Sequence, residues 1–207
     1  MARFLNPWLR RIPARAVWPA GLLPLALLAW EVATGQAGVD PVRAIEHRLG
    51  RTAIYFLLAT LAVTPLLRLT RLNLMRQRQA LGLLCFTYLA GHLLAWVYLD
   101  MGLLWGQMLR DVVKRPYLLF GMAGFLLLLA LALSSNRQSR RALGSRWFVL
   151  HRLIYPASIL GGLHWVWSLK VWDSWALAVL AVILLLILLR LPMILRRVGV
   201  QAGISAV

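Results

Sequence analysis

Three histidines lie inside long apolar stretches of this sequence, where an ionisable side chain is costly. His92 lies in an apolar run that ends near Asp100. His151 and His164 share a later run, "HRLIYPASILGGLHWVW", at 151–167. Imidazole is a common metal ligand and can also pass protons. The histidines therefore allow two kinds of chemistry, ligation of a metal or cofactor and proton transfer.

The apolar stretches are long enough to be membrane spans. Hydrophobic residues make up 61% of the 207, and the mean hydropathy is +0.75, whereas soluble domains are about 45–50% apolar. A span needs about 20 helical residues. Six runs reach that length: 16–35, 50–68, 80–99, 116–134, 147–169 and 174–195. We expect an all-α fold, a single polytopic domain over 1–207 that forms a six-transmembrane-helix bundle.

Charge orients this bundle. One set of segments between spans is strongly basic: Arg3, Arg10, Arg11, Arg15, Arg68, Arg71, Arg76, Arg78, Arg137, Arg140, Arg141, Arg146, Arg196 and Arg197. All the acidic residues fall at or in the other set: Glu31, Asp40, Glu46, Asp100, Asp111 and Asp173. Basic loops stay in the cytoplasm, so both termini are predicted to be cytoplasmic. Because the net charge of +17 comes from these short loops, it indicates a lipid bilayer as partner and not nucleic acid.

Helical geometry sets the depths of the three histidines. At a rise of about 1.5 Å per residue, His92 lies about 12 Å below the outer end of its span. His164 lies about 9 Å below the outer end of its own span. The two are therefore at similar depth on different helices. His151 is about 20 Å from His164 along the same span, near the inner face.

A histidine pair at matched depth suits haem, because a planar macrocycle between two helices takes one imidazole on each face. Glycine lets backbone approach closely; Gly91 adjoins His92, and Gly161 and Gly162 precede His164. The anionic propionates would favour cations of the outer loops. Those available are Arg48, Arg51, Arg110, Lys114, Arg115 and Lys170.

Other interpretations of the pair stay open. Each histidine could be a hydrogen-bonded polar residue between helices or part of a proton relay. Zinc is disfavoured, because carboxylates are missing at this depth and Cys85 is the only cysteine. The outer-loop His47, beside Glu46 and Arg48, is expected to be solvated. Three tryptophans could line the ring or form an interfacial belt, and the belt is favoured: Trp96, Trp165 and Trp167.

The inner end of the fifth span carries a single histidine. A second bis-histidine site with His151 would need a partner at the inner end of the third span, where Arg78 and Gln79 stand. Such a site would be completed by Arg78, by water or by nothing. Arg152 would hold a propionate or a flavin phosphate, or would extend to the inner headgroups. Pro156 cannot donate to the carbonyl of Arg152, so the span is expected to kink there.

These residues resemble a known family. The "GH" at Gly91 and His92, the "HRLIY" from His151 to Tyr155, and His164 thirteen residues after His151 resemble the ferric-reductase-like transmembrane family. The length, the six spans and "HRLIYPA" more closely resemble its MsrQ (YedZ) family. That family comprises the haem-binding membrane subunits of the bacterial periplasmic methionine sulfoxide reductase system. The resemblance covers nearly the whole chain.

The resemblance implies a multi-pass, non-catalytic electron-transfer subunit of the bacterial inner membrane, with one or two haems b and FMN. It implies electrons from the quinone pool or a cytosolic flavin reductase. It also implies delivery to a periplasmic molybdopterin-dependent methionine sulfoxide reductase subunit that repairs oxidised proteins. By position, His92 and His164 would ligate the outer haem, and His151, with Arg78 and Arg152, would serve an inner haem or cofactor. The fourth histidine of the family's oxidases is missing here, which puts a conventional second bis-histidine haem in doubt.

The residues themselves favour a relay between partners. No glycine-rich dinucleotide fingerprint follows a strand, and the tail after the sixth span is too short for a flavin domain. One alternative is a metal-ion or quinone reductase of the same superfamily. Another is a histidine-based proton-coupled transporter, which the outer positions of Glu31, Asp100 and Asp173 disfavour. A non-redox assembly factor is the third. A visible Soret band would separate haem proteins from the last two.

Overall fold

The computed structural model describes residues 2–169, 171 and 173–190. No strand occurs among these residues, which confirms the all-α prediction. Within this part of the chain, four helices are long and apolar enough to cross a membrane: Ala14–Ala33, Pro41–Thr70, Arg78–Asp100 and Pro116–Leu133. The prediction of a membrane protein is confirmed. The end of the expected sixth span, 191–195, and the basic residues Lys170, Arg196 and Arg197 lie outside the described residues.

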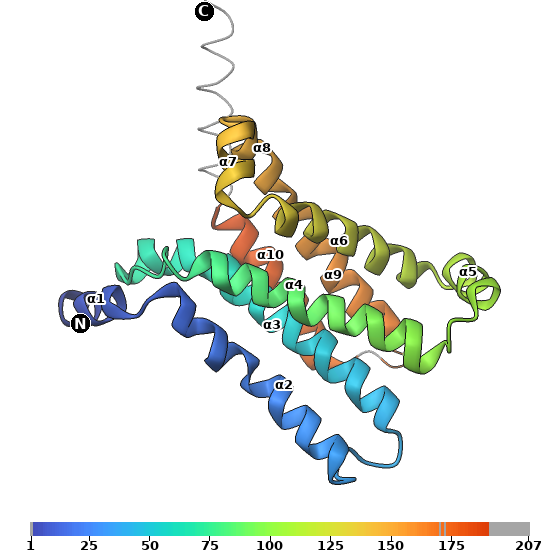
Figure 1. The fold of residues 1–207 in the computed structure, drawn as a ribbon. Helices are drawn as coiled ribbons and strands as arrows, with labels where there is room; N and C mark the ends of the chain where they lie inside the picture. The colour runs from blue at the N-terminus through green and yellow to red at the C-terminus, as the bar shows by residue number, and fades with distance from the viewer. Residues whose placement is uncertain (1, 170, 172, 191–207) are drawn as a thin grey trace, which may run out of the picture.

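The helices lie alongside one another, as Figure 1 shows. In chain order they are α1 (Ala2–Arg11), η1 (Ala14–Ala16), α2 (Val17–Ala33), α3 (Pro41–Thr70), α4 (Arg78–Ala95), the π-helical turn η2 (Trp96–Asp100), α5 (Trp105–Lys114), α6 (Pro116–Leu133), α7 (Arg137–Leu143), α8 (Arg146–Leu150), η3 (His151–Leu153), α9 (Ile154–Ser168) and α10 (Ser174–Leu188). The most extensive packing joins α3 to α4 and α6 to α9, and α10 packs on α9. These pairs set the positions of the histidine-bearing helices.

Helix α3 begins farther out than the sequence analysis expected. The side chain of Asp40 accepts a hydrogen bond from the Arg43 backbone N–H at 3.0 Å, and Pro41 occupies the first helical position. Both features start helices. The helix therefore extends well before the expected second span, 50–68, and the placement of His47 in a loop was wrong. His47 and Glu46 lie on the first turns of a helix.

The fifth expected span is interrupted at the histidine near its inner end. The chain passes from α8 through one 3-10 turn, His151–Leu153, into α9. The regular helix resumes at Ile154, two residues before Pro156. Because proline has no N–H, Pro156 cannot donate to the carbonyl of Arg152, which lies in that turn. The predicted irregularity therefore occurs, but before the proline and not at it.

The side chain of Tyr88 on α4 is hydrogen-bonded to the backbone of α2. The Tyr88 hydroxyl donates to the carbonyl of Gly21 at 2.7 Å and accepts from the N–H of Leu25 at 3.1 Å. In a regular helix that N–H would bond that carbonyl directly. The hydroxyl is inserted into the ladder next to Pro24, a recognised cause of helix kinks. Tyr88 therefore replaces one helical hydrogen bond of α2 and joins α2 to α4.

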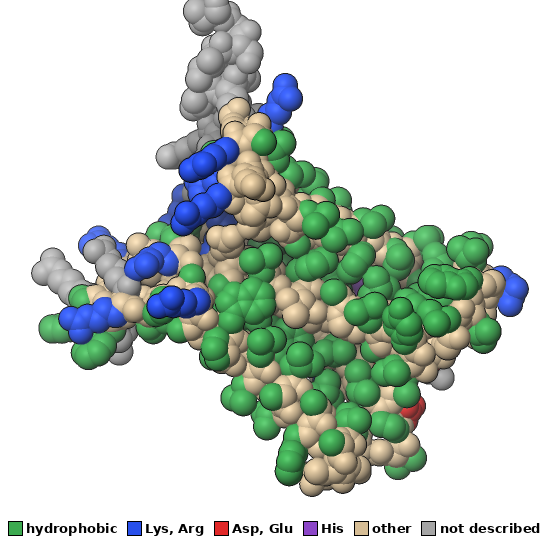
Figure 2. Space-filling view, viewed as in Figure 1, with side chains coloured by type: hydrophobic (Ala, Val, Ile, Leu, Met, Phe, Trp, Pro, Cys, Tyr) green, Lys and Arg blue, Asp and Glu red, His purple; other side chains and the backbone are tan. Residues whose placement is uncertain are grey.

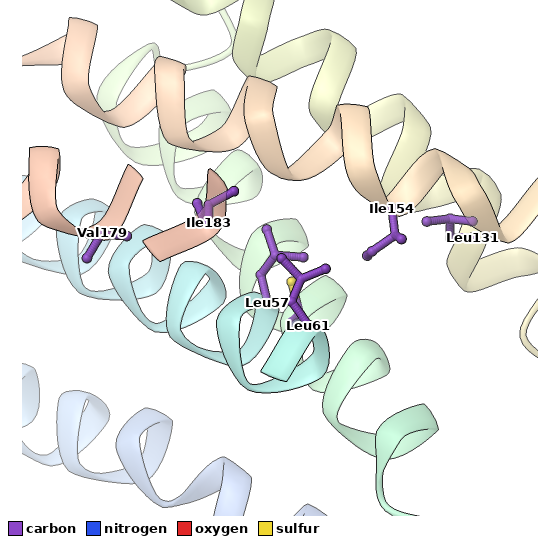
Figure 3. Packing of buried hydrophobic residues seen from close by; sticks show 7 residues of the cluster. Leu57, Leu61, Leu131, Ile154, Val179 and Ile183 are labelled. Carbon is purple, nitrogen blue, oxygen red and sulfur yellow. The ribbon is translucent and has the colours of Figure 1, made fainter. Parts of the chain in front are cut away.

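The larger apolar core lies between α3, α9 and α10. Figure 3 shows Leu57 and Leu61 of α3 directed toward Ile183 of α10 and Ile154 near the start of α9. Leu61 and Ile183 have no exposed surface. This cluster supports the α3–α9 side of the cavity described below.

Charge is segregated along the bundle. Figure 2 shows Lys and Arg gathered at the end that carries α1 and α7, with the visible acidic atoms toward the opposite end. This agrees with the loop charges read from the sequence. Figure 2 also shows broad apolar side chains over the helices between the two ends, as expected of a surface that faces lipid.

Candidate functional site

A cavity of about 280 Å³ lies between α3, α4, α6 and α9. Its wall is mostly apolar, with Leu57, Leu89, Phe125 and Leu128 among the lining residues. This volume is close to the lower end of the range for small-molecule pockets. The cavity could therefore hold an apolar cofactor that makes a few polar contacts.

The structure brings His92 and His164 together in this cavity. Their ring centroids are 6.4 Å apart and their planes differ by 69°. Two metal–imidazole bonds of about 2 Å each, together with the radii of the two rings, require centroids about 6 Å apart. The spacing of the rings therefore fits one metal ion held between them.

Each imidazole is oriented by a backbone carbonyl. His92 Nδ1 lies 2.9 Å from the carbonyl oxygen of Glu46, and His164 Nδ1 lies 2.7 Å from that of Tyr117. A carbonyl accepts, so Nδ1 of each ring carries the proton and donates. This leaves both Nε2 atoms as free lone-pair donors, the usual arrangement of metal-bound histidine.

Two glycines that the sequence analysis did not single out give the rings their space. A Cβ at Gly121 would lie 2.8 Å from His164 Nδ1, and one at Gly50 would lie 3.3 Å from His92 Nδ1. Neither glycine is near its histidine in sequence, so no local motif reveals it. Of the glycines expected to admit a macrocycle, Gly161 lines the cavity, whereas Gly162 packs against Leu180 of α10.

The outer rim of the cavity is polar. Of the cations considered for propionates, Arg51 and Arg115 line the cavity. Arg48 instead forms an ion pair with Glu31 beside a separate crevice of about 420 Å³ between α2 and α3. Arg110 and Lys114 do not line the cavity, and Lys170 lies outside the described residues. His47 is exposed at the rim, as expected of a solvated residue.

The three tryptophans fall into two groups. Trp96 and Trp165 line the cavity, whereas Trp167 is exposed and packs on Phe120 with ring centroids 5.5 Å apart. Trp96 also opens the π-helical turn that follows α4. Such turns are frequent at functional sites. The two inward tryptophans are therefore part of the site and not only of an interfacial belt.

His151 has different surroundings. Its Nε2 is 3.2 Å from the hydroxyl of Ser134, and its ring stacks on Trp147 with centroids 3.8 Å apart. Arg78 is near enough to act on its charge. Gln79 instead donates to the carbonyl of Ser135 at 2.6 Å. Among the described residues, His151 makes no hydrogen bond or ring contact with Arg152 or with a second imidazole.

The donor set of the cavity fits haem better than a bare ion. Within the described part of the chain, no group of three or more His, Cys, Asp or Glu side chains could hold a metal. Two imidazoles alone leave a zinc or iron ion under-coordinated. A macrocycle supplies the missing equatorial nitrogens and needs the apolar walls that are present.

Comparison with known proteins agrees with this geometry. Residues 49–162 match the family described as ferric reductase like transmembrane component. The chain is 44% identical over 164 residues to the protein-methionine-sulfoxide reductase heme-binding subunit MsrQ of Agrobacterium fabrum, covering 78% of this chain and 76% of that one. It is 42% identical over 175 residues to the MsrQ of Brucella ovis, covering 84% and 80%. No solved structure matches the chain.

The chain belongs to the MsrQ family of ferric-reductase-like transmembrane proteins. The matched region contains both ring-accommodating glycines, Gly50 and Gly121, and His92. It ends at Gly162, two residues before His164. In this MsrQ-family chain, the cavity is thus built largely from the segment that the wider family shares.

Proposed function

We propose that this chain is the haem-carrying electron-transfer subunit of a methionine sulfoxide reductase system in a bacterial inner membrane. The observation that carries the proposal is the facing pair His92 and His164, each held by a backbone carbonyl through Nδ1. The names of the relatives support it, since they are heme-binding subunits of protein-methionine-sulfoxide reductase.

The residues of the cavity divide the work of holding haem b. Bound haem iron supplies one-electron redox chemistry. His92 and His164 would hold its iron through their Nε2 atoms. The apolar wall would exclude water, which together with ligand identity sets a haem potential. Arg51 and Arg115 at the rim would face the propionates. We assign no catalytic residue, because these side chains bind and orient but do not react.

The topology we propose has six spans and cytoplasmic termini. Four spans correspond to the long apolar helices, the fifth to α8, η3 and α9 together, and the sixth to α10 and the residues after it. The basic end of the bundle would face the cytoplasm. The histidine cavity would then lie in the outer half of the membrane, with its polar rim facing the periplasm.

This placement suits delivery of electrons outward. We propose that the acceptor is a periplasmic molybdopterin-dependent methionine sulfoxide reductase subunit. The donor would be the quinone pool or a cytosolic flavin reductase, with FMN as a second cofactor. FMN, the donor and the molybdopterin subunit rest on family resemblance, and the outward rim of the cavity supports only the direction of transfer.

We propose that His151, Arg78 and Arg152 serve an inner haem or cofactor site. The proximity of Arg78 to His151 supports a shared site. His151 would have to exchange its contact with the Ser134 hydroxyl for a ligand. A second haem here would have at most one imidazole, so its spectrum would differ from that of the outer haem.

Haem content of histidine variants tests the proposal. We expect purified His92→Ala and His164→Ala each to lose the low-spin b-type absorption of the outer haem, because one axial ligand is gone. His47→Ala is the matched control, since it removes an exposed histidine at the rim of the same cavity. Wild-type spectra in both ligand variants would overturn the assignment. A colourless wild-type protein made with ample haem would favour proton transfer instead.

A further inference from the structure

The inner end of the bundle has cations but no carboxylate side chains. All six Asp and Glu residues of the sequence lie at or in the segments of the opposite end. The two ion pairs of the described residues, Arg48 with Glu31 and Arg115 with Asp111, are both at that outer end. An arginine buried at the inner end therefore has no acidic side chain of this chain to balance it.

Arg190 is such a residue. It follows the end of α10 and is only 2% exposed. Its Nη2 donates to the carbonyl oxygens of Leu61 and Thr60 in α3. The Leu61 carbonyl needs this donor, because Pro65 stands four residues on and has no N–H. These bonds satisfy one nitrogen of the guanidinium, while Nε is buried with no hydrogen-bond partner.

Other cations and a phenol surround Arg190. Tyr155 of α9 lies near enough to Arg190 to act on its charge. Arg78, the first residue of α4, lies near enough to both Arg190 and Tyr155 for their charges to interact. Arg68, near the end of α3, also acts on Arg190. Three chain segments thus bring guanidinium groups near one another, and two of these groups, those of Arg190 and Arg78, lie near Tyr155.

This arrangement is costly without a counter-ion. Removing an unbalanced charge from water costs several kcal/mol even after relaxation. Arginines that repel one another add to that cost. Exposed arginines at the inner face meet lipid headgroups or water, but Arg190 is buried. An anion with several acceptor oxygens could bond both the free Nε of Arg190 and the neighbouring guanidinium of Arg78.

We propose that Arg190, Arg78 and Tyr155 form a binding site for a phosphate group. Guanidinium groups match phosphate oxygens in pairs and remain charged at all physiological pH values. The phosphate belongs either to a phosphomonoester cofactor or to the headgroup of an anionic phospholipid. Its placement at the cytoplasmic side rests on the proposed topology, but the site does not depend on the haem assignment.

Two pairs of probes that differ only in phosphate test this site on the full-length purified protein. One pair is FMN and riboflavin; the other is phosphatidylglycerol and diacylglycerol, each added in detergent. For one pair, we expect the phosphate-bearing member to bind wild-type protein at least about tenfold more tightly, as one charge-assisted hydrogen bond would give. Preference in the first pair identifies a cofactor phosphate, and preference in the second a lipid headgroup.

Variants connect the preference to the site. Arg78→Gln and Arg190→Gln should each reduce it to about twofold or less, since each removes one charge-assisted contact. Arg137→Gln, an exposed arginine of α7, should keep it. Arg190→Gln could fail to fold, because it removes the donor to the Leu61 carbonyl. In that case the loss of phosphate preference in Arg78→Gln tests the proposal. The proposal is overturned if neither pair shows a preference, or if Arg137→Gln lowers it equally. The Soret band of the same samples reports separately on the outer haem.

Discussion

The outer histidines and the inner histidine differ in which ring nitrogen is hydrogen-bonded and in what that nitrogen contacts. His92 and His164 use Nδ1 on backbone carbonyls and face each other across an apolar cavity. His151 has its Nε2 on a serine hydroxyl and its ring against Trp147, among cations. The residue type is the same, and two of the three share one expected span. The partner of the ring nitrogen, and not the histidine alone, therefore distinguishes a pair oriented for ligation from a polar contact.

The largest effect is expected from filling the space beside an outer imidazole. Gly121→Ala would place a Cβ 2.8 Å from His164 Nδ1 and push the ring off the Tyr117 carbonyl. We expect haem affinity to fall about 10- to 100-fold, as for other losses of the group that orients a ligand. Haem titration of the apoprotein measures this.

Gly82, which lies on α4 and not beside a histidine ring, provides the control for Gly121 of α6. A Cβ at Gly82 would meet only Thr60 at an ordinary 3.8 Å, so Gly82→Ala should bind haem like the wild type. Gly50→Ala should fall between the two, since its Cβ would lie 3.3 Å from His92 Nδ1. Equal affinities for Gly121→Ala and Gly82→Ala would contradict the proposed packing of the outer site.

A smaller effect, on stability alone, is expected at Tyr88. Tyr88→Phe leaves the Gly21 carbonyl and the Leu25 N–H without the hydroxyl that bridges them. We expect the free energy of unfolding to fall by about 1–3 kcal/mol. No residue of α2 lines the cavity, so haem content should not change. Loss of haem at unchanged stability would show that α2 takes part in the outer site.

The inner histidine should matter less to the outer haem. His151→Ala removes the Ser134 contact and the stacking on Trp147, which together contribute about 1 kcal/mol. We expect the outer haem to remain and its reduction by the physiological donor to slow. Stopped-flow absorption of the Soret band measures that rate. An unchanged rate would remove His151 from the electron path.

The smallest expected effect is electrostatic. Arg51→Gln removes a rim cation, and a cation near haem favours the reduced iron, so the reduction potential should fall modestly. The shift should shrink at high salt, because Arg51 is exposed. Spectroelectrochemical titration at two salt concentrations checks both statements. Arg110→Gln is the control, since Arg110 does not line the cavity; an equal shift there would argue against a specific rim contact.

Much of the fold could be predicted from the sequence, because hydropathy and loop charge are local signals. The helical, membrane-spanning character follows from them, and so does the similar depth of His92 and His164. The early start of α3 also has a local signal in the sequence, because Asp40 followed by Pro41 is typical of a helix N-terminus. The displaced break in the fifth span had a weaker one, because a proline affects the turn before it.

The rest depends on contacts between distant segments. The carbonyls that orient the two histidines are distant in sequence. The carbonyl of Glu46 is 46 positions from His92, and the carbonyl of Tyr117 is 47 positions from His164. Gly50 and Gly121 are needed only because each lies against a histidine ring from a different helix. Arg190 lies within the expected sixth span, and the carbonyl that it bonds, which Pro65 leaves without a helical donor, is on another helix. Hydropathy carries no information about such pairings.

The most direct test of the central claim is the electron paramagnetic resonance spectrum of the oxidised, purified protein. Two axial imidazoles make ferric haem low-spin, and rings as far from parallel as 69° should make the signal strongly anisotropic. We predict a low-spin signal that disappears in both His92→Ala and His164→Ala. A haem-loaded wild-type protein without a low-spin signal, or a low-spin signal that survives in either variant, would contradict a haem held between these two histidines.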